Sequence, residues 1–176
     1  MTGSPKERLA IDPLPGYDPE IGLLLGMLEQ GRQRTRERLE NLHDQDLDWA
    51  PATGENSIGT ILYHLAAIEL DWLYSEVLEQ PFPPGTEALF PDDVRDDEGR
   101  LTIARGATLQ SYFDRLDTVR GQLLAAFTGM SPAEFHRERD LPDYTVTPAY
   151  VLHHLMQHEA EHRGEIGMLR MLMPRP

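Results

Sequence analysis

The sequence contains no cysteine. This absence excludes disulfide bonds, thiolate zinc sites and a cysteine nucleophile. A site for a soft divalent metal must therefore be built from histidine and carboxylate side chains. Long apolar runs are also missing, since no stretch approaches the roughly 20 uninterrupted apolar residues that cross a bilayer. The first twenty residues hold no apolar run that resembles a signal peptide. We therefore expect a cytoplasmic protein without a membrane partner.

Basic residues are scarce, because 16 lysines and arginines face 30 aspartates and glutamates, which gives a net charge of −14. Such a charge repels the phosphate backbone of nucleic acids unless a basic stripe offsets it. The one basic cluster lies within residues 32–38, where Arg32, Arg34, Arg36 and Arg38 alternate with other residues. On a helix these arginines would fan around the surface among glutamates, so we interpret them as a solvated face. We expect no nucleic-acid partner.

The length of 176 residues and the 40% hydrophobic content fit one globular domain. Residues 1–17 hold three prolines and two glycines, so we expect an extended N-terminal arm there. Residues 18–176 should then form the folded domain. This assignment rests on composition and on the helix signals that begin at residue 18.

Four segments carry helical signals, and none of the rest gives a convincing series of strands. Capping residues and apolar periodicity predict helices over 18–42, 57–80, 108–127 and 147–173, with a short capped turn at 131–134. Residues 81–106 are rich in proline, glycine and aspartate and form the longest connection, which is usually functional or crosses an end of the bundle. We predict an all-α four-helix bundle with this long connection between its second and third helices.

Two histidines of the last predicted helix fall on its apolar face. His158 and His162 are four residues apart, so they lie one turn above the other. At about 100° per residue, they share a direction with Val151, Leu155, Ile166, Leu169 and Met173. Burying two imidazoles in a core costs free energy that hydrogen bonds or a metal must offset. Because imidazole is the commonest metal ligand, this pair favours a metal site over core packing.

A third ligand is available in the second predicted helix, where His64 lies at the rim of the apolar face. By itself a histidine beside an apolar stripe indicates ordinary packing. Facing helices of a bundle, however, build metal sites from inward side chains. Three histidines would leave coordination positions open for water or substrate, which is typical of a catalytic site. His154 is either an outer partner or an alternative ligand, whereas His153 should be exposed and His43 and His136 lie near a helix end and in a short connector.

Two other metal motifs compete with this interpretation. Residues 158–162 match His-Glu-x-x-His, in which Glu159 would be the general base of a zinc protease. The mixed α/β setting and the further downstream ligand of that class are missing. A ferritin-like site of two metals would need two Glu-x-x-His pairs, which Glu159 and Glu40 could begin, and two more glutamates. The second helix offers His64 where such a site needs a carboxylate, so both stay minor alternatives.

The stretches LDWAPATGENSIGTILYHLAAIELDWL and HHLMQHEAEHRGEIGMLR resemble the DinB-like superfamily of metal-dependent YfiT-type proteins. The resemblance covers about residues 18–173 and implies a metal site at His64, His158 and His162. It also implies one divalent ion, with zinc or nickel favoured, a small-molecule substrate and a homodimer. Some members resemble transferases that use low-molecular-weight thiols such as bacillithiol or mycothiol. Asn56 replaces the usual tryptophan before the capping serine, which puts details of the substrate pocket in doubt.

The expected function is a metal-dependent enzyme, with a thiol S-transferase ahead of a hydrolase and of a non-catalytic metal-binding or stress-response bundle. Glu165 lies about 40° and Glu161 about 80° from the histidine face, whereas Glu159 lies on the opposite flank. Glu161 and Glu165 are therefore the catalytic candidates, able to orient a histidine or to carry a proton, against the alternative of surface glutamates. Tyr63 and Asp71 flank His64 and are candidate outer partners.

Overall fold

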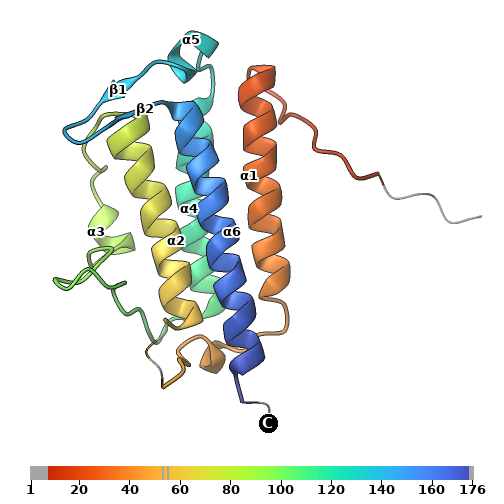
Figure 1. Cartoon of the computed structure of the whole chain (residues 1–176), viewed down its shortest axis with the longest axis vertical. Helices are drawn as coiled ribbons and strands as arrows, with labels where there is room; N and C mark the ends of the chain where they lie inside the picture. The colour runs from red at the N-terminus through yellow and green to blue at the C-terminus, as the bar shows by residue number, and fades with distance from the viewer. Residues whose placement is uncertain (1–7, 53, 55, 175–176) are drawn as a thin grey trace, which may run out of the picture.

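A computed structural model describes residues 8–52, 54 and 56–174 of the chain. In chain order its elements are α1 (Pro19–Arg38), η1 (Asp44–Asp46), α2 (Ile58–Trp72), the π-helical η2 (Leu73–Val77), α3 (Thr86–Leu89), α4 (Leu109–Phe127), α5 (Pro132–Phe135), β1 (Arg139–Asp140), β2 (Thr145–Val146) and α6 (Pro148–Leu172). The long helices α1, α2, α4 and α6 lie side by side (Figure 1), with α6 against α1 and α2, and α4 against α2. The predicted all-α four-helix bundle with a long connection after its second helix is confirmed.

Each long helix begins at a side-chain cap that the sequence predicts. Ser57, Thr108 and Thr147 accept hydrogen bonds from the backbone N–H groups three residues later, and Asp18 accepts one from Glu20. Each cap satisfies one of the backbone donors that a helix start leaves unpaired. Proline follows the cap in α1 and α6, where its missing N–H costs nothing. The capping chemistry therefore fixes where the four helices start.

The helix ends differ from the prediction. The first helix ends at Arg38 rather than near residue 42, and Asn41 adopts a left-handed conformation with φ of 59° just beyond it. The second helix passes into the π-helical segment η2, where Leu78 N–H donates to Leu73 O at 3.0 Å, before Glu79 turns with φ of 53°. The short α3 and the two-stranded hairpin, in which Arg139 pairs with Val146, were not predicted.

Residues 11–14 of the expected N-terminal arm lie against α1, while residues 1–7 lie outside the described part of the chain. Leu14 N–H donates to Gly22 O at 3.0 Å. A Cβ atom at Gly22 would meet Leu14 O at 2.8 Å, and one at Gly26 would meet Asp12 O at 2.7 Å. These two glycines therefore let the preceding backbone lie directly on the helix.

Two apolar clusters fill the bundle, one around Ile61, Leu116 and Ile166 and the other around Leu28, Leu123 and Leu155. Each long helix also carries a buried charged residue, which lies in the sequence between residues of one cluster and residues of the other. These four residues are Arg32, Glu69, Arg120 and Glu159. We call these four residues the buried ion quartet. Each helix in the described part of the chain is too short or too polar to cross a membrane.

The quartet joins all four long helices. Arg32 donates from Nη2 to Glu69 Oε2 at 2.7 Å and from Nε to Glu159 Oε1 at 2.8 Å. Arg120 Nε donates to Glu69 Oε1 at 2.6 Å, and its Nη2 lies 3.6 Å from Glu159 Oε2. Burial alone would raise the pKa of Glu69, but the two guanidinium groups outweigh it and hold that pKa below its usual range. Both carboxylates are thus paired on the two arginines.

The prediction that Arg32 belongs to a solvated face is wrong, because this residue is only 5% exposed. The buried face of α1 runs through Leu25, Leu28, Arg32 and Thr35, which is the helical period of an inward stripe. Charge patterning alone assigned the arginine to the surface. Arg36, one turn later, is partly exposed and pairs with Asp117 of α4.

Removal of one quartet member should destabilise the fold strongly. We expect Arg120→Met to lower the free energy of unfolding by about 3–5 kcal/mol, because Glu69 and Glu159 would share one guanidinium in the core. Urea denaturation followed by circular dichroism measures this loss. Arg100→Met is the matched control, since Arg100 pairs with Asp96 at the surface and should change the urea midpoint little. A loss below about 1 kcal/mol for Arg120→Met would contradict a structural role for the quartet.

Candidate metal centre

Three histidines from two helices converge on one point. His64 of α2 places Nε2 at 3.0 Å from Nε2 of His158 in α6, and His162 Nε2 lies 3.1 Å from the same atom. Within the described ranges, these are the side chains that could hold a metal ion as a group of three or more. The structure thus brings together the three residues singled out in the sequence.

Local geometry and helix packing both contribute to this convergence. The i, i+4 spacing stacks His158 over His162 on the face of α6 that packs on α2. Glu159 follows His158 directly and Glu69 lies five residues after His64, and both glutamates bind Arg32. The same ion pairs that align α2 with α6 therefore hold the imidazoles at one height.

The imidazoles of His64 and His158 are uncharged at neutral pH. Burial lowers the pKa of His64 to about 4, and the charges of His162 and Arg95 act in the same direction. Burial also lowers the pKa of His158 to about 3, with the neighbouring histidines and Arg95 adding to the effect. Neutral imidazole offers a lone pair on one ring nitrogen, which is the form that binds metals.

The spacing of the three nitrogens fits a divalent ion. With nitrogen ligands at about 2.05 Å in tetrahedral geometry, two ligand atoms are about 3.3 Å apart. The observed separations of 3.0 Å and 3.1 Å are close to this value. Three lone pairs directed at one another repel unless a cation or a proton lies between them. The donor set therefore suits a divalent metal that accepts imidazole ligands.

Of the two catalytic candidates, one contacts the histidine group. Glu165 Oε2 lies 3.1 Å from Nδ1 of His162 and can accept its proton, which leaves Nε2 as the free donor atom. Glu161 is exposed and makes no described contact with the three histidines; burial lowers the pKa of His154, and the charge of Glu161 only partly opposes this shift. The geometry therefore gives Glu165 an orienting role and gives Glu161 none.

The described residues do not form the geometry that either competing motif requires. Glu159 is buried among the arginines of the quartet, so it has no path to a reacting group as the base of a zinc protease. His43 is exposed at the start of η1 and is not part of the histidine group. The second Glu-x-x-His pair of a ferritin-like site is therefore missing from this centre.

The remaining candidates have other contacts. His154 stacks on Trp72 with ring centroids 3.9 Å apart, and its ring is 5.8 Å from that of His158, so it is a packing neighbour of the centre. Tyr63 donates to Asp92 O at 2.6 Å, and Asp71 accepts from Ser75 at 3.3 Å. Neither Tyr63 nor Asp71 has a described contact with His64. His153 is exposed, as expected.

Sequence reasoning missed Arg95, whose charge acts on both His64 and His158. Arg95 belongs to the 81–106 connection, where no periodicity or motif marks its position. It lines a cavity of about 510 Å³ together with Ser57 and Thr60 of α2 and with Arg100 and Arg105. This basic cavity lies at the N-terminal end of α2, within two helical turns of His64.

The comparisons with known proteins agree with the fold. A family model of the DinB superfamily matches residues 27–166, which include all three histidines. The chain belongs to the DinB superfamily. A crystal structure of a conserved protein from Enterococcus faecalis is similar to this superfamily member, with a TM-score of 0.67, 16% identity and coverage of 85% of this chain and 94% of that one. At this identity the likeness shows the fold alone, and no curated protein matches the chain.

The contact between Glu165 and His162 predicts a specific tautomer. In metal-free protein His162 should carry its proton on Nδ1, because the Glu165 carboxylate accepts it there. In Glu165→Ala the ring should shift toward the Nε2–H form that free imidazole prefers. Nitrogen-15 NMR of the imidazole measures the tautomer, and the matched control Glu161→Ala should leave it unchanged. An Nε2–H tautomer in the unsubstituted protein would contradict the proposed orientation.

Proposed function

We propose that this DinB superfamily member is a metal-dependent enzyme in which His64, His158 and His162 hold one divalent ion, zinc or nickel. The observation that carries the proposal is the convergence of three Nε2 atoms, two of which belong to imidazoles that burial keeps uncharged. A set of three protein ligands leaves coordination positions free, as catalytic sites do. When bound, such an ion polarises substrate groups and lowers the pKa of a water or thiol at neutral pH.

The residues of the chain prepare the site for that chemistry. Burial keeps His64 and His158 unprotonated, so their lone pairs remain available across the physiological pH range. Glu165 fixes the ring of His162 through Nδ1. The quartet holds Glu159 away from the reacting groups, so proton transfer falls to Glu165 or to the substrate itself.

For the reaction, we propose a transfer that uses a low-molecular-weight thiol of the bacillithiol or mycothiol type. The sequence has no cysteine of its own, so a thiol nucleophile must come from outside. The basic cavity beside His64, with Arg95 and Arg105, suits the carboxylate groups of a thiol of the bacillithiol type. A metal-dependent hydrolase and a non-catalytic metal-binding bundle are the alternatives.

The proposal includes a homodimer, as the resemblance to the family implied. The C-terminal end of α6 exposes large apolar side chains at Met168, Met171 and Leu172, of which Met171 is 84% exposed. Exposed apolar surface of this kind often marks a contact between subunits. This end of α6 is therefore the surface that we assign to the dimer.

The metal assignment predicts the metal content of the purified protein. Protein prepared without a histidine tag should carry about one divalent ion per chain, because three ligands converge. His158→Ala and His162→Ala should each lose most of this metal, as measured by inductively coupled plasma mass spectrometry. His153→Ala is the matched control on the same helix and should retain it. Full occupancy in both ligand variants would show that the metal lies elsewhere.

The thiol assignment predicts metal-dependent conjugation. Metal-loaded protein should join bacillithiol, mycothiol or glutathione to a chromogenic electrophile faster than the uncatalysed reaction, and His64→Ala should abolish this rate. Arg105→Gln should raise KM for the thiol about tenfold and change kcat little, because it removes a charged contact distant from the metal. Hydrolysis of a thiol-free ester without conjugation would support the hydrolase, and inactivity in both assays would support the non-catalytic bundle.

A further inference from the structure

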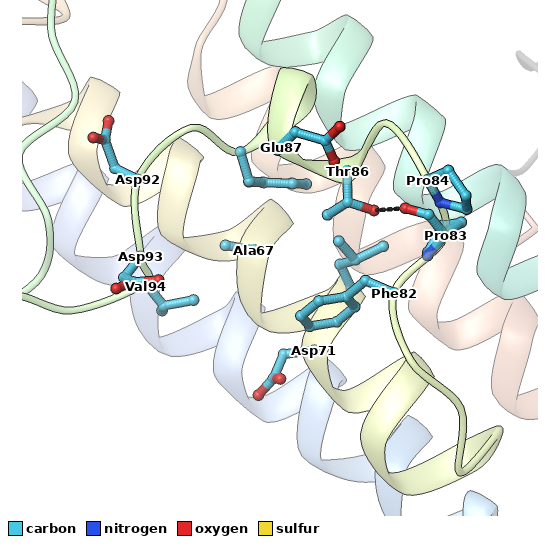
Figure 2. A pocket seen from close by; sticks show the side chains of 12 residues that line it. Ala67, Asp71, Phe82, Pro83, Pro84, Thr86, Glu87, Asp92, Asp93 and Val94 are labelled. Atoms are coloured by element: carbon cyan, nitrogen blue, oxygen red, sulfur yellow. Dashed lines mark hydrogen bonds between the residues drawn. The ribbon is translucent and has the colours of Figure 1, made fainter.

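A second cavity lies along α2 on the other side of His64. Its volume is about 570 Å³, within the range of small-molecule sites. Ala67 and Asp71 contribute to it from α2, three and seven residues after His64, and therefore on the same face of the helix. The opposite wall comes from the 81–106 connection around α3 (Figure 2). The cavity thus extends from the level of the histidines toward the C-terminal end of α2.

The wall of this cavity is held in place by contacts from behind. Tyr63 donates to Asp92 O at 2.6 Å, and Arg115 donates from Nε to Leu89 O at 2.9 Å. The ring of Phe90 packs edge-on against Tyr63 with centroids 5.5 Å apart. These contacts fix the connection on α2 and α4 before any ligand arrives. A preformed wall lowers the ordering cost of binding.

The lining combines an apolar floor with negative charge. Phe82, Phe90 and Val94 give it apolar and aromatic surface. Its charged side chains are all acidic, and in Figure 2 Asp71 lies beside Phe82, with Asp93 on the opposite wall. Arg95, which follows Val94, binds Gly99 O and lines the basic cavity instead.

Asp71 is the acidic residue of this lining that most needs a partner. It is partly buried, and its described hydrogen bond is a long one from Ser75 at 3.3 Å. Burial raises the pKa of Asp71 above its usual value, which means that its carboxylate lacks a compensating positive charge. A cation beside this carboxylate would offset the cost of burial. Aromatic faces such as that of Phe82 also attract cations.

We propose that this cavity binds an organic cation, with an ammonium group on Asp71 and an apolar aromatic body against Phe82 and Phe90. The acidic lining excludes anionic ligands of the same size, since their charge would be repelled and desolvated. The assignment of this ligand as the second substrate of the centre rests on the proposed function, whereas its binding rests on the cavity alone.

Three indole compounds of similar size test the proposal. Tryptamine is a cation at neutral pH, tryptophol is its neutral counterpart and indole-3-acetate is an anion. Their affinities for the full chain are measured by two-dimensional NMR titration, with metal-free and zinc-loaded protein in parallel. Tryptamine should bind at least about tenfold more tightly than tryptophol. Indole-3-acetate should not shift the amide signals of Ala67 and Thr86, and both protein forms should give the same result.

Substitutions locate the ammonium group. Asp71→Asn should weaken tryptamine binding about tenfold and leave tryptophol binding unchanged. Asp97→Asn is the matched control, because it removes the same charge from a position in the 81–106 connection that does not line the cavity. Phe82→Leu should weaken both compounds, since it removes aromatic surface that both indole rings would contact. The amide spectrum of each variant shows whether the fold is intact.

Equal affinities for tryptamine and tryptophol, or unchanged tryptamine binding in Asp71→Asn, would overturn the proposal. Tryptamine binding that requires zinc would also overturn it, because the amine would then coordinate the metal. The two proposals fail separately. If the metal assignment is wrong, tryptamine should still bind the metal-free protein. If tryptamine does not bind, the metal content of the protein is unaffected.

Discussion

The arrangement of the bundle depends on the buried pairing of two arginines with two glutamates, one from each long helix. Charges taken out of water destabilise a fold unless each finds its partner with good geometry. Arg32 contacts both Glu69 and Glu159 through different nitrogens, and Arg120 contacts Glu69 as well. A slip of one helix by one turn, about 5.4 Å, would separate these groups. Apolar packing tolerates such slips far better, so the quartet is what sets the heights of the helices.

The positions of the three histidines depend on this alignment of the helices. His158 precedes Glu159 and His64 lies five residues before Glu69, so the two functional segments are tied to the quartet by short stretches of rigid helix. The two histidine-bearing segments are therefore aligned by ion pairs of the helices, in contrast to small zinc domains that fold only around the ion. Glu159 and Glu69 have a structural role in the quartet. This role of Glu159 also explains why a His-Glu-x-x-His pattern occurs here without a protease site.

The sequence was sufficient for features that depend on neighbouring residues. Helix starts follow from caps such as Ser57 and Thr147, and the pairing of His158 with His162 follows from helical spacing. Arg32 was misjudged because its partners lie 37 and 127 residues away, and a single sequence does not show such distances. The 81–106 connection was expected to be functional or to cross an end of the bundle, but the residues that line the two cavities escaped prediction for the same reason. Their walls come from contacts between α2 and the irregular 81–106 connection, to which no periodic pattern applies.

The π-helical segment η2 has a consequence for how relatives of this protein can diverge. It follows His64 and Glu69 and precedes the connection that forms both cavity walls. A π-turn holds one residue more than an α-helical turn, so loss of that residue would rotate the chain beyond it by about 100°. His64 and Glu69 lie before this point in α2 and would keep their places. A single insertion or deletion at this turn can thus reshape both cavity walls without a substitution in α2 itself.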